Sequence, residues 1–146
     1  MGILINNIMA EGIYKHFMDC QICIDGVNLL QHVQKLRLYA TTIEMWESTQ
    51  LVGLCACYMN DVVNQVAYIT HIAISPQYRK QNYGKQLLEL TISIAQEKGF
   101  KRLDLEVAKD NTTALHLYRS HHFEITEDRC SKYLMSLPLT VDKTVL

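Results

Sequence analysis

The chain has 146 residues, of which 49% are hydrophobic and 20% are charged, and its formal net charge is -1. This length suits one compact unit with a sizeable core, so we expect a single domain over residues 1–146. The near-neutral balance argues against a nucleic-acid partner bound through a generally basic surface. No stretch approaches the roughly 18 consecutive apolar residues that cross a bilayer, so we expect no membrane partner and a cytoplasmic location.

The five cysteines are an odd number, which is typical of a reducing compartment rather than of a disulfide framework. Cys20 and Cys23 form a lone C-x-x-C without the second pair of ligands that a structural zinc site needs. Cys55 and Cys57 alternate along an expected strand, so they are predicted to share one buried face. We therefore expect no metal site.

The first 40 residues are predicted to be mainly helical. One helix is expected over residues 11–19 and a second over residues 27–40. The second carries an apolar stripe at mixed spacings of three and four residues, which suits a helix laid on a sheet. The stripe consists of Leu29, Leu30, Val33, Leu36 and Ala40.

From Thr41 the pattern changes to β-branched and aromatic residues, which favour strands. Three strands are predicted, over residues 42–47, 51–60 and 66–74, and they are expected to form an antiparallel meander. A helix over residues 83–98 follows, with Gly99 placed to stop it.

The last third predicts a strand over residues 102–107 and a helix through Ser120 that Asp110 or Asn111 caps. Two closing strands are expected over residues 123–128 and 132–139. The order of elements predicts an α/β (α+β) fold with a mixed sheet.

A basic, polar turn lies between the strand that ends at Ile74 and the helix that begins near Tyr83. The first N–H groups of a helix have no internal partner, so such a turn can cradle a phosphate group. A solvated basic loop is the alternative interpretation. The P-loop pattern fails because Arg79 stands where its first glycine belongs, and a dinucleotide fingerprint fails because Gly84 is its only glycine.

Another pattern fits this turn. The segment from Tyr68 to Phe123 resembles the GNAT superfamily of N-acetyltransferases. Its acetyl-coenzyme A signature is Arg or Gln, two residues, Gly, one residue, then Gly or Ala. Here the signature reads RKQNYG, residues 79–84, and Asn82 replaces the first glycine. Asparagine tolerates left-handed backbone angles better than most residues, so the turn is expected to survive.

The resemblance continues as LEVAKDNTTALHLYRSHHF, residues 105–123, which matches the family's strand followed by Asn, Ala, Tyr and Phe. His122 stands where the family usually has Gly. The resemblance implies a mixed, mostly antiparallel sheet flanked by helices, with a splayed central strand pair. It also implies acetyl-coenzyme A as cosubstrate.

The resemblance further implies where the coenzyme binds. The pantetheine arm would pair with backbone groups of Ile72 and Ile74, and an N–H near Ile72 or Ala73 would hold the oxyanion. Asn111 resembles the family asparagine that contacts the coenzyme, although helix capping is its expected main role. The pyrophosphate would sit on the signature turn and its amides, formed by Arg79, Lys80, Gln81, Asn82, Tyr83, Gly84 and Lys85.

Acetyl transfer needs a neutral amine, an oxyanion donor and a proton for the leaving thiolate. Tyr118 matches the family tyrosine near the coenzyme sulfur, so it is the predicted general acid. Glu106, twelve residues earlier, occupies a position where some members that acetylate protein amino termini carry a catalytic group. His71 or a chain of water molecules are alternative bases, although His71 alternates with Ile72 along the strand.

The leading hypothesis is an acetyl-coenzyme A dependent N-acetyltransferase that acts on a small-molecule amine. Acetylation of a protein amino terminus or of lysine is the nearest alternative, and a non-catalytic coenzyme A binding module is a third. The acceptor is expected between the N-terminal helices and the strands, and its candidate contacts are Tyr39, Glu44, Trp46 and Tyr68. The sequence leaves a homodimer open.

Overall fold

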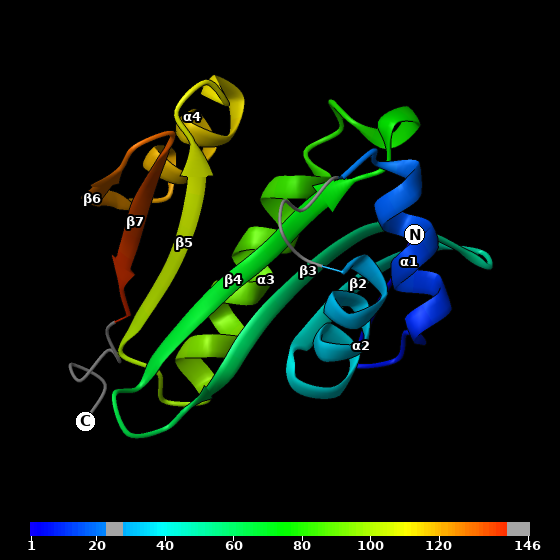
Figure 1. The fold of residues 1–146 in the computed structure, drawn as a ribbon, viewed down its shortest axis with the longest axis horizontal. Helices are drawn as coiled ribbons and strands as arrows, with labels where there is room; N and C mark the ends of the chain where they lie inside the picture. The colour runs from blue at the N-terminus through cyan, green and yellow to red at the C-terminus, as the bar shows by residue number, and fades with distance from the viewer. Residues whose placement is uncertain (23–27, 140–146) are drawn as a thin grey trace.

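The computed structural model describes residues 1–22 and 28–139, which form one seven-stranded sheet with helices on both faces (Figure 1). In chain order the elements are β1 (Gly2–Ile5), α1 (Ala10–Asp19), α2 (Leu29–Tyr39), β2 (Thr41–Glu47), β3 (Gln50–Asp61), β4 (Val66–Ile74), the short 3₁₀ helix η1 (Pro76–Tyr78), α3 (Tyr83–Glu97), β5 (Arg102–Ala108), α4 (Thr112–Ser120), β6 (Glu124–Arg129) and β7 (Lys132–Pro138).

The strands lie in the order β1-β2-β3-β4-β5-β7-β6. Every neighbouring pair is antiparallel except β4 and β5, which run parallel. The predicted mixed, mostly antiparallel sheet and the meander of β2, β3 and β4 are therefore confirmed. The parallel step is possible because α3 carries the chain across one face of the sheet between β4 and β5.

The two faces of the sheet are buried in two separate cores. One core lies under α3 and α4 and contains Cys55 and Cys57, both completely buried, as their alternation predicts. The other core lies under α1 and α2, where Phe17, Leu36 and Leu54 are completely buried. The same strands thus supply alternate residues to opposite cores.

The prediction for the first residues is wrong in two details. Residues 2–5 form the strand β1, which pairs with β2 between Ile43 and Trp46, rather than a helical or irregular segment. All four β1 residues are exposed. Because neither face of this strand is buried, its sequence shows no alternation of apolar and polar residues from which the strand could be predicted. Leu30 was assigned to the buried stripe of α2, but it is 62% exposed.

Glu44 is a structural residue, which corrects its assignment as a candidate acceptor contact. It is completely buried on β2. Its carboxylate accepts hydrogen bonds from the N–H groups of Asn7 and Ile8 at 2.8 and 3.1 Å, and also from the Thr42 hydroxyl and the Trp46 indole. These bonds satisfy the buried charge and attach the segment before α1 to the sheet.

The helices α3 and α4 end in the same way. Gly99 has φ 83 and His122 has φ 72, so both positions are left-handed. The next residue, Phe100 or Phe123, donates its N–H to a carbonyl five residues back, which is the Schellman pattern. His122 therefore occupies a backbone conformation that favours glycine.

Candidate active site between β4 and β5

The parallel strands β4 and β5 pair only over their first halves, Val66–Ile69 with Arg102–Leu105. Beyond that point β4 pairs only with β3, and β5 pairs only with β7, so the two strands diverge (Figure 1). A cleft of about 290 Å³ lies between them, lined by residues of both strands and of α4. The predicted splayed strand pair is confirmed.

The backbone of β4 turns alternate residues toward this cleft. The N–H of Ser75 donates to the Val52 carbonyl at 2.8 Å, so Ser75 faces β3. Because backbone groups alternate in direction along a strand, Ala73 also faces β3, while Ile72 and Ile74 face the cleft. A linear arm can therefore add to β4 as an extra strand would, at the two residues that the resemblance implies.

The turn before α3 is shaped by two left-handed residues, Lys80 and Asn82, both with φ 64. The expectation that Asn82 keeps the turn in place of glycine is thus confirmed. The first helical hydrogen bond runs from the Gln86 N–H to the Asn82 carbonyl at 3.1 Å. Among the described residues no hydrogen bond reaches the N–H groups of residues 80–85, which are therefore available to an anion.

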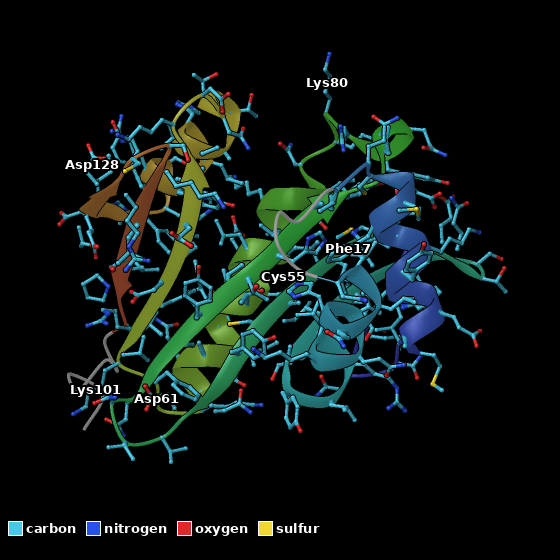
Figure 2. The ribbon with its side chains drawn as sticks, in the orientation of Figure 1. Phe17, Cys55, Asp61, Lys80, Lys101 and Asp128 are labelled. Atoms are coloured by element: carbon cyan, nitrogen blue, oxygen red, sulfur yellow. The ribbon has the colours of Figure 1, made fainter. Side chains whose placement is uncertain are left out.

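Two further observations fit a diphosphate at this turn. A Cβ atom added to Gly84 would meet no protein atom within 4 Å, so the space in front of this first turn of α3 is open. Figure 2 shows Lys80 projecting from the turn away from the rest of the protein. Arg79 Nε donates to the Ile74 carbonyl at 2.9 Å and thereby ties the turn to the end of β4.

Tyr118 lines the cleft from α4 and is only 6% exposed. Its ring packs against Phe123, with ring centroids 5.7 Å apart, which is the hydrophobic contact that accompanies the Schellman end of α4. Burial raises the pKa of the Tyr118 hydroxyl, and the nearby Cys55 thiol raises it further by a smaller amount. The hydroxyl therefore keeps its proton at neutral pH, as a proton donor requires.

Glu106 lines the same cleft from β5 and is held by two neighbours. The Tyr68 hydroxyl donates to Glu106 Oε1 at 3.1 Å, and Arg129 Nη1 lies 3.4 Å from Oε2. Burial and, to a smaller extent, the charge of Glu106 raise the pKa of Tyr68 to about 12. This phenol therefore remains a hydrogen-bond donor. The two contacts orient the Glu106 carboxylate in the cleft, and the Arg129 side chain is exposed to solvent.

His71 also borders the cleft, but its ring is enclosed by α1. Its Nε2 lies 3.0 Å from Nε2 of His16, and its ring stacks on Phe17 with centroids 4.5 Å apart. Burial lowers the pKa of His71 well below its usual value, and the neighbouring His16 and His32 lower it further by smaller amounts. A histidine in this setting is neutral and is a weaker base than a solvated one.

Asn111 acts as the N-cap of α4, because its side chain accepts from the Ala114 N–H at 3.2 Å. This is its predicted main role, and it also lines the cleft. Sequence reasoning placed Tyr68 only among the weak acceptor contacts and did not identify Arg129 or His16. Within residues 1–22 and 28–139, no three metal-ligating side chains lie together, and no helix there is long and apolar enough to span a bilayer.

Comparison with known proteins identifies the family. The profile described as "Acetyltransferase (GNAT) family" matches residues 11–123. The chain therefore belongs to this family of acetyl-coenzyme A dependent N-acetyltransferases, as the resemblance implied.

Two relatives carry names of the same kind. The [ribosomal protein bS18]-alanine N-acetyltransferase of Escherichia coli (strain K12) is 29% identical over 106 residues, 66% of this chain and 72% of that protein. A Bacillus subtilis (strain 168) protein, named "Putative [ribosomal protein bS18]-alanine N-acetyltransferase", is 36% identical over 81 residues. That match spans 56% of this chain and about half, 52%, of the relative.

A solved structure supports the fold. The crystal structure of the ribosomal-protein-S18-alanine N-acetyltransferase from Escherichia coli has a TM-score of 0.77 at 18% identity. The alignment covers 99% of each chain. The predicted GNAT-like arrangement is therefore confirmed for the described sheet and helices.

Proposed function

We propose that this protein transfers the acetyl group of acetyl-coenzyme A to the amino-terminal amine of a protein. The names of its sequence relatives favour this alternative over the small-molecule amine that the sequence first suggested. The observation that carries the proposal is the placement of Glu106 and Tyr118, from β5 and α4, in one cleft beside the open backbone of β4.

The coenzyme would be held by backbone groups more than by side chains. The amides of residues 80–85 have no hydrogen-bond partner among the described residues, and the positive end of the α3 dipole lies behind them, so they would face the diphosphate. Ile72 and Ile74 offer backbone groups to the pantetheine arm, with the Ile74 carbonyl shared with Arg79. Bound there, the coenzyme supplies an acetyl thioester to the cleft that Tyr118 and Glu106 line.

Glu106 is the proposed general base. Its carboxylate accepts the proton that the attacking amine loses as the new carbon–nitrogen bond forms. Tyr68 and Arg129 act as positioning residues, because each contacts one carboxylate oxygen and fixes its direction. His71 is a less suitable base, since its Nε2 is already engaged with His16.

Tyr118 is the proposed general acid. As the carbon–sulfur bond breaks, its hydroxyl gives a proton to the departing sulfur and later regains one from solvent. The raised pKa keeps the phenol protonated until that step. The backbone N–H of Ile72 faces the cleft and is the proposed donor to the oxyanion, in preference to Ala73, whose groups face β3.

A competition experiment tests this function. Purified protein is incubated with acetyl-coenzyme A and three acceptors together: a peptide with a free amino terminus and no lysine, a peptide with a blocked terminus and one lysine, and a polyamine. Mass spectrometry should find acetyl groups chiefly on the free terminus. Acetylation of the polyamine alone would restore the small-molecule hypothesis, and coenzyme binding without any product would indicate a binding module.

A further inference from the structure

A second hollow, of about 470 Å³, lies on the face of the sheet that carries α2. It is bounded by the last turns of α2 and by the ends of β3 and β4 that meet at their hairpin. The residues that enclose it include Lys35, Tyr39, Tyr58, Asn60, Asp61 and Tyr68. The proposed chemistry uses none of these except Tyr68.

The Tyr68 side chain lies between this hollow and the proposed active site. Tyr58 and Tyr68 lie directly opposite each other in the β3–β4 register, and Tyr68 lies opposite Asp104 on β5. Glu106 is two residues beyond Asp104, so all these side chains project from one face of the sheet. The Tyr68 hydroxyl contacts Glu106, and the Tyr68 ring lines the hollow. A chain that leaves the base along this face therefore enters the hollow.

The chemistry of the hollow is aromatic with polar groups at its edges. Three tyrosine rings contribute to its walls, and the buried Tyr58 hydroxyl has no hydrogen-bond partner among the described residues. The Lys35 ammonium lies 5.5 Å from the centroid of the Tyr58 ring. The Asp61 carboxylate is already engaged by the Asn64 backbone and side-chain amides. A hollow walled by tyrosine side chains with polar groups at its edges suits an aromatic side chain.

We propose that this hollow binds an aromatic side chain of the acceptor polypeptide, two to four residues after the acetylated one. Tyr58 on β3 and Asp104 on β5 are two strand spacings apart, roughly 10 Å, and Glu106 lies two residues further along β5, so Glu106 and Tyr58 are roughly 12 Å apart. An extended chain covers about 3.3–3.6 Å per residue, so about three to four residues span that distance. This inference rests on the proposed acetylation of a protein amino terminus and adds the selection of its sequence.

Peptides with free amino termini and alanine at residues two to four provide the test. Phenylalanine, tyrosine, glutamate or arginine replaces alanine at one of these positions in each peptide, and kcat/KM is measured for acetyl transfer. An aromatic residue at one position should raise kcat/KM by roughly tenfold or more. Tyr39→Ala and the hollow-filling Lys35→Trp should both reduce this preference, whereas Tyr14→Ala, an exposed tyrosine of α1, should preserve it.

The outcomes separate this inference from the proposed function. Equal kcat/KM for all peptides, or a preference for glutamate or arginine, would overturn the aromatic site while leaving amino-terminal acetylation intact. An aromatic preference that survives both Tyr39→Ala and Lys35→Trp in folded protein would place the selecting site elsewhere. If no peptide is acetylated but coenzyme A binds, the proposed function fails and this inference fails with it.

Discussion

The Tyr68 hydroxyl of β4 donates a hydrogen bond of 3.1 Å to the Glu106 carboxylate of β5. This contact lies where the two strands begin to separate, since their pairing ends at Ile69 and Leu105. Tyr68 lines the hollow beside α2, and Glu106 lines the cleft that contains Tyr118. The proposed base is therefore held between the proposed coenzyme site and the proposed acceptor site.

Replacing Glu106 by Gln should lower kcat by roughly 10²–10⁴-fold, because the amide cannot accept the amine proton. Steady-state assays with a peptide acceptor give the measurement. Glu127→Gln is the matched control, since the exposed Glu127 contacts the same Arg129 at 3.0 Å but lies outside the cleft lining. Tyr68→Phe should cause a smaller loss, since it removes only a positioning contact. Equal kcat in Glu106→Gln and Glu127→Gln would remove Glu106 from the chemistry.

Tyr118→Phe should lower kcat by about 10²-fold or more and leave coenzyme binding nearly unchanged, because it removes only the hydroxyl of a buried ring. The ring contact with Phe123 is retained, so the end of α4 should stay intact. Calorimetry with coenzyme A and steady-state kinetics separate the two effects. A parallel loss of binding and turnover would make Tyr118 a packing residue.

Gly84→Val should weaken coenzyme A binding by at least about tenfold while the protein keeps its melting temperature. The new side chain meets no protein atom within 4 Å of its Cβ, so it would occupy only the space assigned to the diphosphate. Ser93→Val places the same side chain on an exposed position later in α3 and should leave the Kd unchanged. Calorimetry that finds equal affinity in both variants would remove the turn from the binding site.

The buried His16, which contacts His71, predicts a loss of stability in acid. Burial lowers the pKa of His16 to about 4, against roughly 6.5 in an unfolded chain. Between these two pH values the folded protein binds fewer protons at His16 than the unfolded chain does. The free energy of unfolding is therefore unaffected by His16 above about pH 6.5 and falls as the pH is lowered toward 4. For His16 this loss reaches about 3 kcal/mol.

Urea unfolding at several pH values between 4 and 7.5 measures this dependence. His16→Gln should flatten the dependence of the free energy of unfolding on pH, whereas His116→Gln, at an exposed position of α4, should not. Parallel curves for the wild type and both variants would show that the His16–His71 contact does not control acid stability.

The left-handed ends of α3 and α4 predict opposite effects of glycine. His122→Gly should stabilise the protein by about 0.5–1 kcal/mol, because His122 has φ 72. Gly99→Ala should destabilise it by about 1 kcal/mol, because Gly99 has φ 83 and a new Cβ would meet only open space. Urea midpoints measure both changes, and a loss of stability in His122→Gly would contradict the strain at that residue.

Long periodic segments were predictable from the sequence, because burial of one face leaves a regular pattern. The alternation of Cys55 and Cys57 is an example, and both residues are buried as predicted. Contacts between distant segments were not predictable. The two backbone N–H groups that donate to Glu44 lie 36 and 37 residues earlier in the chain, and His16 lies 55 residues from His71. Strand β1 was missed for the same reason, since its pairing with β2 is long-range and both its faces are exposed.

Assigned backbone amide NMR signals, followed as coenzyme A is added, test whether the diphosphate binds at the start of α3. The largest shifts should fall on the amides of residues 80–85 and on those of Ile72 and Ile74, which face the cleft. The amides of β1, at the far edge of the sheet, should stay unchanged. Saturating coenzyme that leaves residues 80–85 unshifted would contradict the placement of the diphosphate at α3 and the active site built on it.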